Sequence, residues 1–568
     1  MNPFSTVVEA PPAHLPTGNL EVHLETSPMA PSVLQAGVVS TTLNGLLDLV
    51  GSPLMEVSGG DWTLSRLAQW VPIWQNSQLK VTLLAPYAQR GFVLRLEPLA
   101  SGPVQVSGSF EYLGLRRLRE EELLTGFRTR HDPQTGGYTL EANAERTLLA
   151  LGIQVDREPT RADWGNQYVL EWDSGPVTIY VALAPEADGA RTTALHMKQL
   201  GWDALLHQTL YKLEQLTANY NGPLPEVYQR HLLFSYFYAQ ADSLEGRPVL
   251  LSSKSLHASA SGVFRARDGL LHFFPALLRA DRRRARVVLR SVLDHYARWA
   301  GQHTQYLSGP PLYPGFELDE AAAYPLALAR YLEATGPQPE LVAHYRELME
   351  DIMARVQEER HPTLPLFRTH RSPSDQSVPH PYLTYDNALW CVALDRLSVF
   401  WHHRETLKGE TRSILETLLR QAERGGRYTF SFEPGTVSGY TYADDPAGSL
   451  ILLPYYGFCS RQDALWQATA LWILGEDNPN SYRGRFIGEG TGEPALPSGY
   501  SLGNRILAGL LRPSADALMV LEQAPLDMGY TSELFDPQTG FARAGCGAAS
   551  LAGFIANALA ASKESRLI

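Results

Sequence analysis

Residues 313–320 read Tyr313-Pro-Gly-Phe-Glu-Leu-Asp-Glu320 and run into an alanine-rich apolar segment that ends at Gly336. The Pro-Gly pair indicates the end of a loop, and the three carboxylates then fall on the first turn of a helix. Acids are common at this place because they complement the helix dipole. A carboxyl shielded by the neighbouring aromatic side chains can also have a raised pKa and serve as a general acid.

A second loop that carries a carboxylate favours the catalytic interpretation. Residues 529–536 read Gly529-Tyr-Thr-Ser-Glu-Leu-Phe-Asp536 and separate two predicted helices. Glycoside hydrolysis needs two carboxylates on opposite sides of one bond. The two loops therefore predict a pair of catalytic acids, one from each loop.

The composition limits the classes of protein to consider. The chain has 568 residues and a net charge of −12, with 44 % hydrophobic and 19 % charged residues. This length predicts two domains, and the acidic balance argues against a nucleic-acid partner. The sequence contains neither a signal-peptide pattern nor a run of about 18 apolar residues that a membrane helix would need. Three widely spaced cysteines suggest no disulfide framework and no metal site. We expect a cytoplasmic protein without a cofactor.

The first part of the chain, residues 1–195, is predicted to be an antiparallel β-sandwich domain. Apolar and polar residues alternate over 79–83 and 92–96, and again over 177–183 after the turn Asp173-Ser-Gly-Pro176. Period-two patterns interrupted by glycine and proline are typical of such strands. This part contains no recognisable catalytic constellation.

Residues 196–568 are predicted to form a helical domain, so that the whole chain is mainly α. Apolar residues recur at helical spacing, as in Leu341, Tyr345, Leu348 and Ile352. Helices are expected at 201–218, 225–241, 268–279, 281–301, 319–335, 338–358, 386–403, 407–424, 460–475, 500–511, 514–524 and 546–562. The loops between them are alternately short and long, and the long ones are rich in Asp, Glu, Tyr and Gly. A closed ring of helix pairs, with its functional loops at one mouth, would produce this alternation.

The long loops supply candidate binding residues. Arg267 next to Asp268 can grip sugar hydroxyls through charge-assisted hydrogen bonds, and a helix cap with a surface ion pair explains the same two residues equally well. Tyr385, Asp386 and Asn387 can stack on a ligand and bond to it. Asp386 can equally be a helix N-cap.

Two further loops are rich in polar residues. One reads Tyr440-Thr-Tyr-Ala-Asp-Asp-Pro-Ala-Gly-Ser449 and contains Asp445. The other reads Gly488-Glu-Gly-Thr-Gly-Glu-Pro494 and contains Glu489. The second loop lacks the Gly-Lys-Ser/Thr of a phosphate-binding loop, so we do not expect a nucleotide site there.

In order along the chain, these motifs resemble those of the (α/α)6-barrel glycosidases, and most closely glycoside hydrolase family 125, the metal-independent α-mannosidases. Arg267-Asp268 resembles part of that family's Leu-Arg-Asp-Ser motif, and Glu317-Leu-Asp resembles its Glu-Leu-Asp-Ser segment. Ala443-Asp-Asp-Pro-Ala-Gly-Ser-Leu and the following Leu-Pro-Tyr-Tyr-Gly resemble its Asp-Asp-Ala-Asn-x-Pro-Ser-Leu and Leu-Pro-Tyr-x-Gly block. Residues 476–479 and 488–492 resemble the next block, and Thr531-Ser-Glu-Leu-Phe-Asp resembles the loop that bears the base.

The chain also departs from that family. The family's Trp-Phe-Ala-Trp-Ala-Asn segment is here Ala544-Gly-Cys-Gly-Ala-Ala-Ser550, and the serine after the Arg-Asp pair is Gly269. The predicted β-domain is more similar to that of glucoamylase-like and debranching relatives, whose barrels follow a β-sandwich.

The resemblance implies an inverting, exo-acting hydrolase of an α-mannoside or α-glucoside that works on an oligosaccharide or small glycoside without a metal. It places the general acid on Asp319 and the base on Glu533, with their carboxyls roughly 6.5–9.5 Å apart to admit a water. The subsite for the terminal sugar is then expected from Arg267, Asp268, Tyr385, Asp386, Asn387, Asp445 and Glu489.

Several alternatives stay open at this point. Glu317 and Glu320 are the rivals for the general acid, although Glu317 is expected to point away from Asp319. A phosphorylase of the same barrel class needs a cationic phosphate pocket and no base, and Glu533 in its loop favours hydrolysis over it. A catalytically inactive carbohydrate-binding protein is the alternative outside the enzymes, because segment 544–550 is altered and because fold and function separate easily.

Overall fold

The computed structural model describes residues 14–110, 112–117, 120–124, 127–142, 149–165 and 167–562. Backbone contacts divide the chain into two compact units. The sheet unit comprises the described parts of Pro12–Tyr220 together with Leu232–Val263, and the helical unit comprises Asn221–His231 and the described part of Phe264–Ile568. The sheet unit thus takes in residues beyond 195, and a functional boundary at residue 195 stays a prediction.

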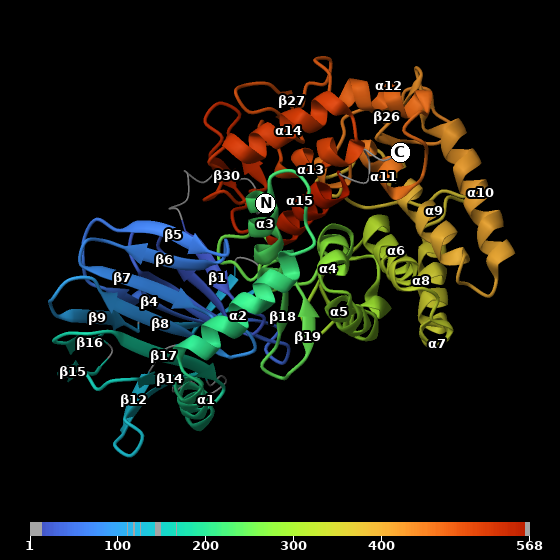
Figure 1. The fold of residues 1–568 in the computed structure, drawn as a ribbon. Helices are drawn as coiled ribbons and strands as arrows, with labels where there is room; N and C mark the ends of the chain where they lie inside the picture. The colour runs from blue at the N-terminus through green and yellow to red at the C-terminus, as the bar shows by residue number, and fades with distance from the viewer. Residues whose placement is uncertain are drawn as a thin grey trace. The chain divides into compact units, whose positions relative to one another are not determined.

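The sheet unit contains two antiparallel sheets (Figure 1). The first has nine strands: β1 (Leu15–Gly18), β2 (His23–Thr26), β3 (Ser32–Ser40), β4 (Gly45–Val57), β9 (Val104–Ser109), β10 (Tyr112–Arg117), β11 (Glu120–Leu124), β15 (Arg161–Asp163) and β16 (Gln167–Trp172). The second has eight: β5 (Thr63–Leu67), β6 (Val71–Gln75), β7 (Leu79–Leu84), β8 (Gly91–Pro98), β12 (Phe127–Asp132), β13 (Gly137–Ala142), β14 (Ala150–Val155) and β17 (Val177–Ala184).

The two sheets share one hydrophobic core and so form a β-sandwich. Leu24 and Leu47 of the first sheet belong to the same buried cluster as Val81, Leu94 and Ile179 of the second. The three predicted strand segments correspond to β7, β8 and β17. Burial of alternate apolar side chains against the facing sheet therefore explains the period-two pattern in the sequence.

A helix that the sequence did not predict covers the outer side of the second sheet. α1 (Ala187–Leu200) contacts β13, β14 and β17, and its Ala190 packs against Ala150 and Ala184. All residues of β14 and β17 are buried, because these strands are covered on both faces. α2 (Trp202–Thr217) follows directly.

The segment 232–263 is bound to the sandwich by buried polar contacts. It contains the end of α3 (Pro225–Tyr238) and the hairpin of β18 (Gln240–Asp242) and β19 (Pro248–Leu250). Lys254 Nζ donates to the carbonyl of Asn19 at 2.7 Å, and Ser255 Oγ donates to Glu25 at 2.8 Å. These partners lie on strands or turns of the first sheet, so the segment belongs to the sandwich although it follows two helices.

The helical unit consists of alternating outer and inner helices. The outer helices are α3, which begins in this unit, α5 (Arg282–His295), α8 (Arg346–Glu358), α10 (Arg404–Gln421), α12 (Ala464–Ile473) and α14 (Leu511–Gln523). The inner helices are α4 (Phe274–Ala280) with the π-helical turn η1 (Arg267–Phe273), α6 (Leu318–Thr335), α9 (Thr384–Ser398), α11 (Leu453–Tyr456) with the 3₁₀ turns η3 (Pro446–Gly448) and η4 (Leu450–Leu452), α13 (Gly499–Ala508) and α15 (Ala549–Ala561). Two short helical pieces, η2 (Ala297–Trp299) and α7 (Pro339–His344), lie in connections.

The inner helices close into a ring. α4 contacts α6, and the contacts continue through α9, α11, α13 and α15 back to α4. Almost every residue of α6, α9, α13 and α15 is buried, whereas α8 and α14 bury only one stripe. Figure 1 shows α10, α12 and α14 on the outside of this ring. This is the closed ring of helix pairs that the alternation of loops predicted.

The long connections all run from the end of an outer helix to the start of an inner one. They carry short strand pairs: β20 (Gln302–Gln305) with β21 (Pro311–Phe316), β22 (Tyr382–Leu383) with β25 (Ser431–Phe432) and β26 (Tyr440–Thr441), β23 (Glu423–Arg424) with β24 (Arg427–Tyr428), β27 (Ser481–Tyr482) with β28 (Gly488–Glu489), and β29 (Leu534–Phe535) with β30 (Ala542–Ala544). They therefore gather at one end of the ring, which we call the mouth. Among the described residues, no helix is long and apolar enough to cross a membrane.

Candidate active site

The candidate site is built where the inner helices begin. α6 starts after Glu317, whose backbone is still extended (φ −127°, ψ 123°), so Asp319 and Glu320 occupy its first turn. α9 starts at Thr384, and Asp386 lies in its first turn. Negative side chains are favourable there because they face the positive end of the helix dipole. Both helices begin at the mouth, so their acids gather at the same end of the ring.

Three carboxylates at the start of α6 converge on one buried arginine. Arg267 Nε donates to Oδ2 of Asp319 at 2.9 Å. Its Nη2 donates to Glu317 and, at 3.3 Å, to Oε1 of Glu320. The backbone N–H of Arg267 donates to Oε2 of Glu320 at 3.0 Å, and Nη1 donates to the carbonyl of Pro373. The guanidinium is 3 % exposed, so these charge-assisted bonds are shielded from water and fix all three carboxylates.

Two expectations about these residues were wrong. The guanidinium of Arg267 turns toward α6 instead of pairing with Asp268, whose Oδ1 lies 3.8 Å from Nδ1 of His272. Glu317 does not point away from Asp319, because both bind the same guanidinium. Helical spacing does not apply to Glu317, since it precedes the helix and its extended backbone turns its side chain to the same side.

The three carboxylates have different protonation behaviour. Burial raises the pKa of Asp319 to about 6, against the opposing charge of Arg267 and with a further contribution from Glu317. Burial alone would raise the pKa of Glu317, but Arg267 and His303 hold it below its usual value. Burial raises the pKa of Glu320 well above its ordinary value. Glu317 is therefore held in its ionised form, burial favours the protonated form of Glu320, and Asp319 titrates closer to neutral pH than an ordinary aspartate.

A second group of buried charges adjoins Glu317, and the sequence did not single it out. His303 Nδ1 lies 2.5 Å from Oε1 of Glu317 and 3.3 Å from Oδ1 of Asp375. Arg265 Nη1 donates to Oδ2 of Asp375 at 2.9 Å. These residues come from separate connections and follow no motif or period, so only the fold brings them together.

The same histidine, glutamate and aspartate are close enough to suggest a metal site. Glu317 is already paired with Arg267, and Asp375 with Arg265. A divalent cation at this place would be repelled by two buried guanidinium groups. We therefore read the cluster as an ion-pair network, and activity without a metal stays our expectation.

Asp386 is a buried acid with few bonds of its own. It is 1 % exposed, and neither side-chain oxygen has a partner at good hydrogen-bond geometry among the described residues, although the Thr369 hydroxyl is near enough to lower its pKa. Burial raises the pKa of this carboxyl well above its ordinary value, and the charge of Asp319 raises it further. Its neighbour Tyr385 is also buried and donates its hydroxyl proton to Tyr456 at 3.2 Å. A buried polar group without a partner is costly, so Asp386 is a strong candidate for bonding a ligand.

Two of the predicted sugar-binding residues instead hold loops. Asn387 Nδ2 donates to the carbonyls of Phe367 and Leu383, at 2.9 and 3.0 Å, and its Oδ1 accepts from the N–H of Phe367 at 2.8 Å. Glu489 binds Arg505 in a two-pronged ion pair, with its oxygens 3.0 Å from Nε and 2.5 Å from Nη2. Both side chains are buried and use their bonding capacity within the protein.

Asp445 has a similar structural task. It caps η3 by accepting from the N–H of Ala447 at 3.0 Å. It also accepts from Ser372 Oγ at 2.6 Å and from the N–H of Ser374 at 2.8 Å. Asp445 thereby fastens the turn at 372–374, whose Pro373 binds Arg267, to the start of η3. Its charge also contributes to the raised pKa of Asp319, so it acts on the acid from nearby.

The predicted base, Glu533, lies in a loop that is pinned on two sides. Its backbone N–H donates to the carbonyl of Gly545 at 3.1 Å, and its carbonyl accepts from Gly499 at 2.9 Å. The preceding Thr531 bonds to His231, which the sequence did not indicate, through Oγ1 at 2.8 Å and its N–H at 3.1 Å. The side chain is partly exposed, unlike that of Asp319.

Gly545 and Tyr500 complete the surroundings of Glu533. A Cβ atom on Gly545 would lie 2.4 Å from Cβ, Cγ and Cδ of Glu533, so only glycine leaves room for this side chain. Burial raises the pKa of the Tyr500 hydroxyl, and the charges of Asp268 and Glu533 add to the effect, with Arg267 opposing it. Tyr500 thus lies within electrostatic reach of Glu533, of Asp268 and of Arg267.

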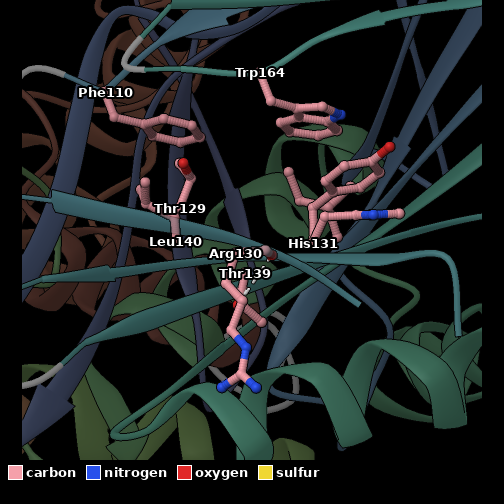
Figure 2. A pocket seen from close by; sticks show the side chains of 9 residues that line it. Phe110, Thr129, Arg130, His131, Thr139, Leu140 and Trp164 are labelled. Carbon is pink, nitrogen blue, oxygen red and sulfur yellow. Dashed lines mark hydrogen bonds between the residues drawn. The ribbon is translucent and has the colours of Figure 1, made fainter. Parts of the chain in front are cut away.

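A cavity of about 130 Å³ in the sheet unit does not belong to this site. It lies between the two sheets, where Phe110 and Trp164 approach strands β12 and β13 (Figure 2). Tyr138 stacks on Trp164 with ring centroids 3.8 Å apart, and Figure 2 shows Arg130 pointing away from these rings. Ligand pockets usually measure about 300–1,000 Å³. We read the cavity as an incompletely filled part of the sandwich core.

Comparison with known proteins relates the chain to glycosidases. The family model of metal-independent alpha-mannosidases, glycoside hydrolase family 125, matches residues 362–503, a stretch that contains Asp386 and Asp445. A search of curated proteins found no match.

Two solved structures are among those found to be similar. A bacterial glucoamylase complexed with acarbose aligns with 99 % of this chain and 97 % of its own, at 11 % identity and a TM-score of 0.67. A Streptococcus pneumoniae protein from a family of metal-independent alpha mannosidases, in a non-productive complex with alpha-1,6-mannobiose, aligns with 62 % of this chain and 98 % of its own, at 18 % identity and a TM-score of 0.49. The glucoamylase match spans both units and confirms the predicted fold class, an (α/α)6 barrel preceded by an antiparallel β-sandwich. With the family match, it identifies the chain as a glycoside hydrolase in class.

Proposed function

We propose that the chain is an inverting, exo-acting glycoside hydrolase of α-mannosides or α-glucosides, with Asp319 as general acid and Glu533 as general base. The observation that carries the proposal is the setting of Asp319. It lies at the start of an inner helix, Arg267 fixes its position, and burial raises its pKa to about 6. A carboxyl whose pKa is raised toward the working pH can hold a proton for a departing glycosidic oxygen more readily than an ordinary aspartate.

Asp319 is better suited to this role than its two rivals. Its charge adds to the raised pKa values of Tyr385 and Asp386 on α9 and of Tyr456 on α11. Asp319 therefore faces residues of other inner helices, which is expected of a side chain that points toward the axis of the barrel. Arg267 and His303 hold the carboxyl of Glu317 in its ionised form. A general acid must carry a proton, so Glu317 does not suit this role.

Burial also raises the pKa of Glu320, so its hydrogen bonds are compared with those of Asp319. Both oxygens of Glu320 accept hydrogen bonds from Arg267, one from the backbone and one from the side chain. In Asp319, Oδ2 accepts from Arg267 and Oδ1 from the N–H of Glu320. These bonds are equal in number, so the preference for Asp319 rests on its charge acting on Tyr385 and Asp386 of α9 and on Tyr456 of α11.

Glu533 is the candidate base because its loop is rigid while its side chain is partly exposed. An inverting hydrolase needs roughly 6.5–9.5 Å between its two carboxyls, so that a water fits on the face opposite the leaving group. The expected product of an α-glycoside is therefore the β-anomer. Proton NMR during the first minutes of the reaction, before the sugar anomers equilibrate, would reveal it.

The comparisons support two sugars to different degrees. The family match at residues 362–503 favours an α-mannoside, since that family is described as alpha-mannosidase. The combination of sandwich and barrel is the architecture of a glucoamylase, which keeps an α-glucoside in consideration. A phosphorylase would need a free cationic pocket, but Arg265 and Arg267 are both bound to carboxylates. No observation favours a non-catalytic binding protein.

The decisive experiment compares leaving groups. Asp319→Asn should lose at least about 100-fold in kcat/KM on disaccharides, a typical contribution of a general acid. The loss on activated aryl glycosides should be much smaller, because an activated leaving group needs little protonation. Steady-state rates on α-mannosides and α-glucosides with leaving groups of graded pKa would measure the difference.

Two matched variants complete the test. Glu533→Gln should reduce turnover of all these substrates alike, because water attack is needed in every case. Glu320→Gln keeps the size and neutral charge of the protonated rival and should retain the leaving-group pattern of the parent protein. Equal losses for Asp319→Asn across all leaving groups would refute its role as acid and shift the assignment to Glu320.

A further inference from the structure

A cluster of aromatic side chains at the mouth, separate from the acids already described, has the features of a second sugar-binding surface. It consists of Arg427, Tyr440, Tyr442 and Trp472, and we call it the platform. Ring centroids are 5.2 Å apart for Tyr440 and Tyr442, and 5.4 Å apart for Tyr442 and Trp472. The guanidinium carbon of Arg427 lies 4.9 Å from the ring centroid of Tyr442 and 5.8 Å from that of Trp472. All four side chains are partly exposed.

The platform lies on elements that lead into the candidate active site. Trp472 is at the end of the outer helix α12, and Arg427 and Tyr440 begin β24 and β26 in the connection after α10. These places are at the mouth, where outer helices end. Tyr442 is two residues before the buried Asp444, in the connection that continues to Asp445 and η3.

A small sheet connects the platform to the start of α9. Tyr440 pairs with Phe432 of β25, and Phe432 pairs with Tyr382 of β22. Adjacent strands are about 4.8 Å apart, so Tyr440 lies roughly 10 Å from Tyr382. Asp386, with its unbonded carboxyl, is in the first turn of the helix that follows β22. The platform therefore lies within the length of a few sugar units from the acids of the candidate active site.

The chemistry of the platform fits a carbohydrate. Exposed Tyr and Trp rings offer flat apolar faces with polar edges, and the apolar C–H face of a pyranose can stack on them. Among the described residues, none accepts a hydrogen bond from the guanidinium of Arg427 or from the indole N–H of Trp472. These donors are therefore available for sugar hydroxyls. In an exo-acting enzyme the terminal sugar lies at the acids, so a surface farther out meets the sugars on the leaving-group side.

We propose that the platform binds the leaving-group side of the substrate, and that the natural substrate is an α-linked oligosaccharide of at least three sugars. This inference rests on the proposed function and adds the length of the substrate to it. Stacking by Tyr442 and Trp472, with hydrogen bonds from Arg427, holds the sugars that follow the one at Asp319. The contribution appears only with substrates long enough to reach the platform.

The test is a comparison of chain lengths. The substrates are 4-nitrophenyl α-mannoside with α-1,6-linked manno-oligosaccharides of two to four sugars, and 4-nitrophenyl α-glucoside with α-1,4-linked gluco-oligosaccharides of the same lengths. In the series that the protein hydrolyses, kcat/KM should rise from the disaccharide to the trisaccharide. Trp472→Ala and Tyr442→Ala should lower the ratio of kcat/KM for the trisaccharide to that for the aryl glycoside at least fivefold, about 1 kcal/mol, mainly through KM.

Ring-preserving and neighbouring variants serve as controls. Trp472→Phe and Tyr442→Phe keep a stacking ring and should retain most of the ratio. Leu471→Ala removes an apolar side chain that is 69 % exposed on the same helix but makes no part of the ring cluster, and should leave the ratio unchanged. Titration of the trisaccharide into Glu533→Gln by calorimetry, with and without Trp472→Ala, gives a binding readout that does not depend on turnover.

The possible outcomes separate the two proposals. If the alanine variants keep the trisaccharide ratio of the parent protein while all glycosides are still hydrolysed, the platform is not a sugar site and the proposed function stands. If the parent protein hydrolyses neither series, the proposed function fails and the platform proposal fails with it. A lowered ratio and weaker trisaccharide binding in the alanine variants, with the phenylalanine variants near normal, would establish the platform.

Discussion

At the scale of single residues, the site is dominated by an excess of buried acid. Glu317, Asp319, Glu320 and Asp386 are all at most 1 % exposed, and Arg267 is the cation that bonds to the first three. One guanidinium cannot neutralise four carboxylates in a medium of low dielectric, so some of them must keep their protons. Buried carboxyls of this kind can supply a protonated acid near neutral pH. The folded protein should lose stability as pH rises and these carboxyls release their protons.

Asp444 allows this loss to be measured away from the proposed acid. It is 7 % exposed, and burial raises its pKa to about 8. Between about pH 4 and 8 the unfolded chain releases this proton while the folded chain keeps it, so the group's contribution to stability falls as pH rises through that window. Asp444→Asn is neutral throughout and should be more stable than the parent protein at pH 8.5 by on the order of 5 kcal/mol, with little difference at pH 4. Urea unfolding at both pH values would measure it.

Asp536 provides a control of opposite sign. It accepts from the N–H groups of Gln538 and Thr539 and pairs with Arg543, and these bonds hold its pKa below its usual range. Asp536 therefore stabilises the folded protein at pH values above its pKa in the unfolded chain. This stabilisation is lost as pH falls through its lower pKa in the folded protein. Asp536→Asn should therefore destabilise the protein at pH 7, and the loss should begin to shrink only as pH falls below about 4. If the difference in stability between Asp444→Asn and the parent protein does not grow as pH rises from 4 to 8.5, the protonated state assigned to Asp444 is wrong.

At the scale of elements, the regular pattern of the sequence predicted most of the helices. The stretch 338–358 repeats apolar residues on one face and forms α7 and α8, which bury Leu341, Met349, Ile352 and Val356. The elements that were missed have physical reasons. α1 buries only Ala190, Ala194 and Met197, so its apolar stripe is weak in the sequence. η3, η4 and α11 are only three or four residues long, too short for a helical repeat to show.

The candidate site was also only partly predictable from the sequence, because many of its contacts form only in the folded protein. Acids at the start of a predicted helix can be read from the sequence, as for Asp319 and Asp386. Their partners cannot, because the contact of Arg267 with α6 depends on two helices that meet only in the folded ring. Asn387 and Glu489 look like ligand-binding residues in a polar loop, and only the structure reveals that Phe367 and Arg505 use their bonding capacity.

The loop formed by β29 and β30 yields a prediction at this scale. Gly545 has φ +62°, and the space that a Cβ would need is filled by the side chain of Glu533. Gly545→Ala should therefore displace Glu533 and reduce kcat at least tenfold on both aryl glycosides and oligosaccharides. The backbone strain of an alanine at positive φ adds a loss of roughly 1–2 kcal/mol in unfolding free energy.

Gly336→Ala separates strain from displacement. Gly336 ends α6 with φ +88°, and nothing lies within 4 Å of the position its Cβ would take. This variant should lose similar stability in thermal unfolding but retain kcat. If Gly545→Ala keeps the kcat of the parent protein, then the position of Glu533 does not matter for the reaction and its role as base is refuted.

At the scale of the whole molecule, the order of the chain and the division into units do not coincide. The chain builds the sandwich, passes into the helical unit at Asn221–His231, returns for Leu232–Val263, and only then completes the barrel. The segment that returns is tied to the sandwich by buried groups. Arg116 donates to the carbonyl of Ser255 at 3.1 Å, and Tyr238 donates to that of Leu24 at 2.6 Å. A simple cut at residue 195, which would also fall within α1, is therefore expected to leave the sandwich incomplete.

Two fragments test this expectation. Fragment 1–263 contains the whole sheet unit and should unfold cooperatively when heated, as followed by circular dichroism. Fragment 1–195 lacks the returning segment, so buried groups such as the guanidinium of Arg116, the carboxylate of Glu25 and the carbonyl of Asn19 lose partners. Each lost partner costs about 1–3 kcal/mol, and several together exceed much of the roughly 5–15 kcal/mol by which a domain is stable. Fragment 1–195 should therefore aggregate or melt without a cooperative transition. If it instead melts as sharply as 1–263 and at the same temperature, the returning segment is an accessory, and residue 195 is the true boundary of the sandwich.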